Sequence, residues 1–252
     1  MPNQLIVEKA IQVMQSIPGW PSLRVLDLSC GEGALLEMLQ AAGCEVEGTH
    51  YREDDYILKN PKAILSTATI HKEVDLTRRL PFDDQSYDVV IATEVMEHLP
   101  SHSAMLAEVS RMLKPGGHFL CSTPNIHRLA SRVQFALTGY HELRSARLGW
   151  HVPPDALYST HHNPVYLPVL HTLLHHNGLH IETVRFIKCS LPALLLIPLL
   201  PVVLVATAVE TRHAIKRSRA GGRDLLRWMN DVRLLFSNTL FILARKSDDG
   251  PG

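Results

Sequence analysis

The sequence predicts an α/β fold in which helices cover both faces of a doubly wound, mainly parallel sheet of seven strands. Two observations support this prediction. Short apolar runs alternate with amphipathic helical patterns, as is typical of strand–helix–strand units, and right-handed crossovers place such strands in one parallel sheet. With 252 residues, of which 46% are hydrophobic, the chain is also long enough to bury one large core.

The first unit combines a strand over 23–28 with a turn that contains two glycines and then a helical pattern. Gly31 and Gly33 let the main chain approach a ligand that a side chain would block. A strand, a glycine turn and a helix bring backbone N–H groups up to a nucleotide-like ligand. No third glycine completes the dinucleotide fingerprint. The carboxylates of Asp27 and Glu32 oppose a diphosphate and favour a ligand that carries an amine or a sulfonium.

The remaining elements follow at regular spacing. Helices are predicted over 3–17, from 34 to Gly43, over 103–113 and over 129–137, and strands over 44–49, 70–76, 87–92, 118–122, 180–187 and 239–245. Ligands of such folds bind at the carboxyl ends of the parallel strands. We therefore expect Gly31, His50, Asp75 and Glu94 to lie at one edge of the sheet.

The stretch from Asp27 to Gly33 resembles motif I of class I S-adenosylmethionine (SAM)-dependent methyltransferases, usually D-x-G-x-G-x-G, with Ser29 in place of the first glycine. The run LPFDDQSYD at 80–88 resembles the lead into strand 4 of the same family. The resemblance implies a Rossmann-like fold and SAM as the cofactor. It implies a cofactor-binding set of Asp27, Ser29, Gly31, Gly33, His50, Tyr51, Asp75, Leu76 and Glu94.

Four positions of that set concern the nucleoside: His50, Tyr51, Asp75 and Leu76. His50 stands where the family carries an acidic residue that binds both ribose hydroxyls, and an imidazole supplies one such bond without negative charge; Tyr51 or Glu53 can assist. The family also carries an aspartate that accepts from the adenine amino group, while the next backbone N–H serves a ring nitrogen. Asp75 and Leu76 match these two positions.

Glu94, Glu97 and His98 follow the fourth strand at spacing i, i+3, i+4, which puts them on one face if the segment is helical. They resemble the E-x-x-E-H motif of ubiquinone-type O-methyltransferases, which is associated with a divalent metal near the acceptor hydroxyl. A metal there lowers the pKa of the hydroxyl. Alternatively, the segment only orders the turn around the methionine moiety, or His98 is a general base.

Residues 124–179 are predicted to form a cap that binds the substrate. The pattern that begins at His162 resembles bacterial methyltransferases encoded with cell-surface polysaccharide genes. His151 and His162 flank the cap, so they join His98 as candidate catalytic residues. His171 and His175 have zinc-ligand spacing, but no cysteine or acidic partner accompanies them, which favours a solvated helix face.

An apolar and then basic insertion at 188–238 separates strands 6 and 7, so the methyltransferase domain covers 1–187 plus 239–246. Residues 191–209 carry no charge and reach about 28 Å as a helix, barely enough for a ~30 Å hydrocarbon core. A single crossing would separate strand 7 from the rest of its sheet, and Pro198 and Pro201 break the helix. We expect a peripheral or monotopic membrane contact through 191–233; the alternative is a lid or dimer contact.

The amino-acid composition limits the classes of partner that the protein is expected to bind. A formal net charge of zero argues against a nucleic-acid binder, and four cysteines without a C-x-x-C pair suit reduced thiols in the cytoplasm. The expected function is methyl transfer from SAM to an oxygen of a membrane-associated lipid or glycan intermediate, at the inner face of the cytoplasmic membrane. The alternatives are a soluble small-molecule methyltransferase and a catalytically silent SAM-binding subunit.

Overall fold

The computed structural model describes residues 4–51, 68–141, 160–189, 191–218 and 223–248. The chain forms a seven-stranded sheet in the order β3-β2-β1-β4-β5-β7-β6. The strands are β1 (Arg24–Asp27), β2 (Glu45–Thr49), β3 (Thr69–His71), β4 (Tyr87–Thr93), β5 (Leu113–Pro124), β6 (Leu179–Cys189) and β7 (Ser237–Lys246). Neighbours from β3 to β5 are parallel, and β7 is antiparallel to both β5 and β6. The predicted mainly parallel sheet is confirmed.

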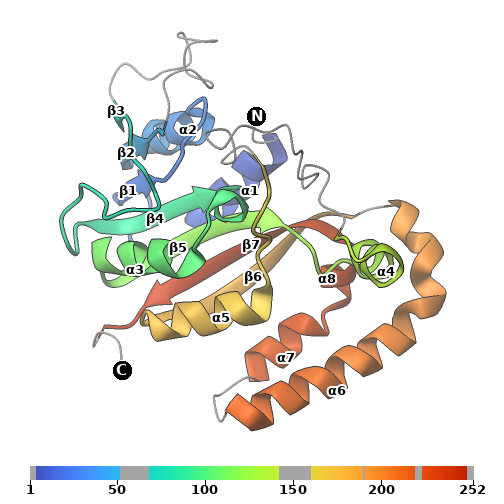
Figure 1. Ribbon diagram of the computed structural model, residues 1–252. Coiled ribbons are helices and arrows are strands. Elements are labelled where there is room, and N and C mark those ends of the chain that lie inside the picture. Colours follow the sequence, from blue (N-terminus) through green and yellow to red (C-terminus); the bar gives the residue numbers. More distant parts are fainter. Residues whose placement is uncertain (1–3, 52–67, 142–159, 190, 219–222, 249–252) are drawn as a thin grey trace.

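Helices cover both faces of this sheet, as Figure 1 shows. They are α1 (Gln4–Met14), α2 (Ala34–Ala42), the 3₁₀ turn η2 (Met96–His98), α3 (His102–Met112), α4 (Leu129–Thr138), α5 (Leu167–His176), the 3₁₀ segment η4 (Leu191–Leu199), α6 (Leu200–Ser218), α7 (Arg223–Met229) and α8 (Val232–Phe236). The apolar sides of α1 and α2 pack on one face of the sheet, and those of α3 and α5 pack on the other. The fold is therefore doubly wound.

The carboxyl ends of β1, β2 and β4 lie together because the strands run in register. Asp27 pairs with Gly48 on one side and with Ile91 on the other. The turn after β1 is held at this edge, since the backbone N–H of Ser29 donates to Thr49 Oγ1 at 2.9 Å. Ser29 has a φ of 65°, in the left-handed region. A hydroxyl side chain thus occupies a conformation that favours glycine, at the position where the family motif has one.

The third strand is shorter than predicted. It ends at His71, because the His50 N–H closes the ladder on the His71 carbonyl and Glu73 then takes a φ of 58°. Asp75 lies beyond the strand in a turn, where Oδ1 accepts from both the backbone N–H and the hydroxyl of Thr77. This local turn replaces the extended backbone that the pattern of 70–76 predicts.

The insertion between β6 and β7 changes from η4 to α6 at Leu200, two residues after Pro198. By length and composition, Leu195–Arg217 can cross a membrane, and 6% of its most apolar stretch is buried. Figure 1 shows α6 at the outer margin of the molecule, beyond α4 and α7. Its inner face packs on α4 and α8; the packing residues of η4 and α6 are Leu196, Leu200, Val203 and Leu204.

Candidate active site

Buried polar atoms without hydrogen-bond partners gather at the carboxyl edge of the sheet. Four of the six such side-chain atoms among the described residues are Asp27 Oδ1, His50 Nδ1, Glu97 Oε1 and His161 Nδ1. Nearly all buried polar groups in proteins have a partner, and an unpaired one costs about 1–3 kcal/mol. Their concentration on the strands and loops of one edge indicates a site that a polar ligand completes.

Asp27 is the most strongly perturbed group on the β1 side of this edge. It is 2% exposed, and burial raises the pKa of its carboxyl to about 8. A cationic group of a ligand would favour the ionised form. The glycines of the following turn have left-handed φ angles of 55° at Gly31 and 81° at Gly33, so the main chain turns sharply past the carboxyl.

The nucleoside side of the predicted site is only partly brought together. His50 is buried and its backbone is fixed on both sides, by the His71 carbonyl and by the Val74 N–H. Tyr51 is 44% exposed next to it. The Asp75 carboxylate bonds to Thr77 and forms an ion pair with Arg78 at 3.1 Å, while Leu76 packs against the core. Glu53 lies outside the described residues.

Glu94 does not share a helical face with Glu97 and His98, so that prediction is wrong. Glu94 has a φ of 55°, and the helical turn begins two residues later, at Met96. Its Oε1 accepts from Ser122 Oγ at 2.9 Å on the neighbouring strand β5. The reason is that the chain turns sharply as it leaves β4, so Glu94 precedes the helical turn and bonds to β5.

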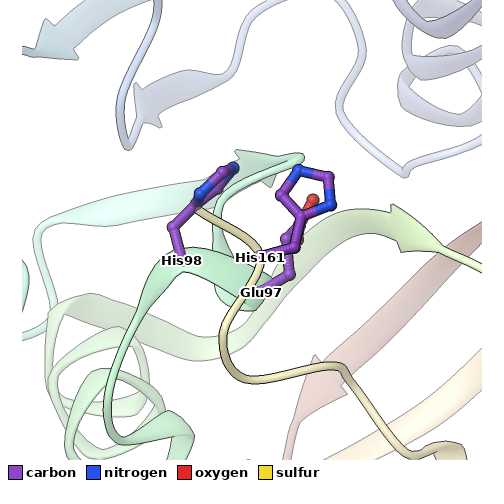
Figure 2. Close-up of side chains that lie close together, drawn as sticks. All are labelled: Glu97, His98 and His161. Carbon is purple, nitrogen blue, oxygen red and sulfur yellow. The ribbon is translucent and has the colours of Figure 1, made fainter. Parts of the chain in front are cut away.

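Glu97 and His98 instead meet His161, which lies within the predicted cap region. One ligand atom from each lies within 4.8 Å of the others (Figure 2). Glu97 is fully buried; burial, with Glu94 next to it, raises the pKa of its carboxyl to about 8. The His98 and His161 rings lie edge to face with centroids 4.6 Å apart. His98 Nδ1 is 3.1 Å from the Thr160 carbonyl, which only accepts, so this nitrogen carries the proton.

The other two predicted catalytic histidines do not join this group. His162 Nδ1 lies 3.1 Å from the Thr160 carbonyl. His151 lies outside the described residues. His161 was missed because the motif points to its neighbour His162, and nothing in the sequence says which of two adjacent residues faces the sheet. The contact that decides this is tertiary: the Asn163 N–H donates to the Glu97 carbonyl at 3.1 Å.

Solved structures share this architecture across almost the whole chain. A SAM-dependent methyltransferase from Mesorhizobium loti has a TM-score of 0.55 at 18% identity, covering 94% of this chain and 96% of that one. Magnesium protoporphyrin IX methyltransferase from Synechocystis, with bound SAH, has a TM-score of 0.56 at 17% identity, covering 97% and 83%. The fold is that of the class I SAM-dependent methyltransferases.

The sequence comparison is more specific. The profile of the methyltransferase domain family matches residues 9–184, and the chain belongs to that family, whose methyl donor is SAM. Ubiquinone biosynthesis O-methyltransferase from Roseobacter denitrificans is 33% identical over 141 residues, which cover 54% of this chain and 56% of that protein. The protein of the same name from Aliivibrio fischeri is 31% identical over 133 residues, which cover 52% and 56%. The chain thus matches little more than half the length of these relatives.

Proposed function

We propose that the protein transfers a methyl group from SAM to an oxygen of a lipid or a lipid-linked glycan at the cytoplasmic face of the membrane. One observation supports the reaction: on a SAM-dependent methyltransferase fold, buried polar atoms without partners gather at the carboxyl edge of the sheet. Asp27 binds the amino group of the methionine moiety, the turn from Ser29 to Gly33 passes along the cofactor, and His50 bonds the ribose. Tyr51, Asp75, Leu76 and Glu94 complete the cofactor site.

The transfer is an in-line displacement, for which positioning supplies much of the rate. The acceptor oxygen must lose its proton as the new bond forms. We assign this role to His98, because the Thr160 carbonyl, 3.1 Å from its Nδ1, orients the ring at this edge of the sheet. An oxygen acceptor agrees with the printed names of the O-methyltransferase relatives.

The outer face of the insertion supports a membrane-associated acceptor. Its exposed apolar residues are Leu195, Ile197, Leu199, Val202, Val205 and Val209, and those from Leu199 onward recur at helical spacing. Beyond them the helix becomes basic, with Arg212, Lys216 and Arg217 exposed. A bilayer satisfies both parts, hydrocarbon against the apolar stretch and anionic headgroups against the basic end.

The inner face decides how this helix meets the bilayer. Leu196, Leu200 and Val203 are packed against α4 and α8. Arg132 Nη1 of α4 also donates to Thr207 Oγ1 of α6 at 2.6 Å. A helix held along its inner side by the protein cannot be surrounded by lipid, so η4 and α6 lie in the plane of one leaflet.

Self-association of this face is the competing interpretation of the insertion. An antiparallel pair of α6 helices would place the basic end of one copy against the apolar stretch of the other. A parallel pair would place basic end against basic end, which is repulsive. The bilayer avoids both conflicts, and this charge arrangement favours it over a dimer.

Two measurements test the proposal. When the protein is incubated with radiolabelled methyl-SAM and a total lipid extract, label should move to the organic phase. Label confined to water-soluble products would favour the soluble alternative. Wild-type protein that binds no SAM would favour the silent subunit.

Vesicle flotation tests the membrane contact, and wild-type protein should float with vesicles that contain phosphatidylglycerol. Arg212→Gln with Lys216→Gln and Arg217→Gln should weaken this roughly 100-fold, since each cation contributes about 1 kcal/mol near an anionic surface. Wild-type protein that is monodisperse without detergent and ignores vesicles would contradict membrane binding.

A further inference from the structure

Glu97, His98 and His161 converge from two separate parts of the chain. Glu97 and His98 belong to η2, and His161 belongs to the segment before α5 in the predicted cap region, more than 60 residues later in the sequence. Figure 2 shows the three side chains pointing toward one another. Their ligand atoms lie within 4.8 Å of one another.

Two of the three residues carry a buried atom that the described residues leave without a partner. These atoms are Glu97 Oε1 and His161 Nδ1. Glu97 is 0% exposed, so water does not compensate for the unpaired oxygen. A carboxylate oxygen and an unprotonated imidazole nitrogen each present a lone pair. Such atoms are satisfied by a proton on one of them or by a cation between them, and these two atoms form no hydrogen bond with each other.

The surroundings also match those of metal ligands. A metal-binding histidine commonly donates its second ring N–H to a carbonyl, and a ligating carboxylate is itself hydrogen-bonded. His98 Nδ1 lies 3.1 Å from the Thr160 carbonyl, and Glu97 Oε2 accepts from Thr123 Oγ1 at 3.2 Å. These contacts fix the orientation of both side chains.

We propose that Glu97, His98 and His161 bind one divalent transition-metal cation, with zinc the best match. Two imidazoles and one carboxylate suit zinc, whereas magnesium prefers oxygen ligands and retains its water. Three protein ligands leave one position open for water or an acceptor oxygen. The set differs from the one that the sequence motif implies, because His161 takes part and Glu94 does not.

The site would join the cap to the end of strand β4. If the proposed methyl transfer to an oxygen is correct, a bound cation would take over the role assigned to His98: it would lower the pKa of the acceptor hydroxyl, whose proton would then leave to water. Cation binding itself does not depend on that function, so the two can fail separately.

Direct binding is the test, by calorimetry and by elemental analysis after dialysis against zinc. Wild-type protein should retain one equivalent, and the cobalt-loaded form should show the visible absorption of a low-coordinate site. Glu97→Gln and His161→Gln should each weaken zinc binding tenfold or more. Magnesium should compete only at a large excess.

The controls separate this site from its neighbours. Glu94→Gln should keep the zinc equivalent, which distinguishes the observed set from the motif set, and His175→Gln should keep it because that residue belongs to the separate group on α5. Circular dichroism and thermal unfolding, measured on every variant, show that each is folded. The site would be overturned if wild-type protein held no stoichiometric zinc. It would also be overturned if Glu97→Gln and His161→Gln bound zinc as tightly as wild-type protein. Wild-type protein that binds zinc but does not bind SAM would count against the proposed function instead.

Discussion

The carboxyl edge of the sheet and the η4–α6 insertion are incomplete in opposite ways. At the edge, polar atoms such as Asp27 Oδ1 and Glu97 Oε1 are buried without partners. On the insertion, Leu195 is 84% exposed and Val202 70%, and no described residue covers them. Soluble folds normally avoid both conditions. The comparison teaches that the kind of unsatisfied surface identifies the kind of partner: a small polar ligand at the edge and an apolar, anionic surface at the insertion.

The two regions are also mechanically connected. α4 begins shortly after β5 leaves the sheet, and its residues Leu129 and Val133 pack on the inner face of the insertion. Arg132 of the same helix bonds Thr207 of α6. The helix α6 is therefore held at a fixed position relative to the strand ends that carry the candidate site.

The largest expected effect comes from a substitution at the carboxyl edge of the sheet. Asp27→Ala should abolish SAM binding, because it removes the one buried carboxylate beside the glycine turn. Loss of one partner of a buried ion pair costs about 3–5 kcal/mol, which is at least a 100-fold loss of affinity. Calorimetry with SAM and SAH measures it. The exposed Asp83→Ala is the matched control, and wild-type affinity in Asp27→Ala would refute the assigned role.

The next largest effect is expected from substitutions on the exposed apolar face of α6. Val202→Glu with Val205→Glu should weaken vesicle binding roughly 100-fold, since full burial of each valine is worth about 1.5–3 kcal/mol. Vesicle flotation measures it, and SAM affinity should not change. Val169→Glu with Thr172→Glu adds the same two charges at the same spacing on α5. Equal loss in this control would show that net charge, and not the apolar face, governs binding.

A smaller effect is expected in the pH dependence of SAM binding at the carboxyl edge. The pKa of Asp27 is raised to about 8, so the free protein holds the neutral carboxyl below that pH. A cationic ligand group needs the carboxylate, so binding releases a proton. Affinity for SAM should then rise about tenfold per pH unit from 6 toward 8 and stop rising above it. Calorimetry in buffers of different ionisation enthalpy counts the proton. A pH-independent affinity would contradict the assigned role of Asp27.

The strands and helices were predictable because their signals are local. The apolar runs of β1, β4 and β5 and the glycine turn after β1 are visible in the sequence, and parallel pairing follows from the alternation. The short β3 was not predictable. Asp75 has a strand-like neighbourhood in the sequence, but its side chain bonds Thr77 and the chain turns instead.

The strand-4 end shows a second limit. Regular spacing of Glu94, Glu97 and His98 predicts one face only if the backbone is helical throughout, and a left-handed φ at Glu94 breaks that condition. His161 enters through a contact across more than 60 residues, which no local pattern encodes. Likewise, hydropathy finds the apolar stretch of α6, but only the packing of Leu196 and Leu200 distinguishes its inner face from its outer face.

The position of β7 has a consequence for the order in which the chain is assembled. This strand, the last in the sequence, lies between β5 and β6 and pairs with both. Until residues 237–246 leave the ribosome, β5 and β6 each present an open edge in the interior of the future sheet, a form prone to pairing with other chains. The apolar insertion is synthesised before that gap closes. During translation, the apolar stretch of α6 is therefore exposed before the sheet that carries it is complete.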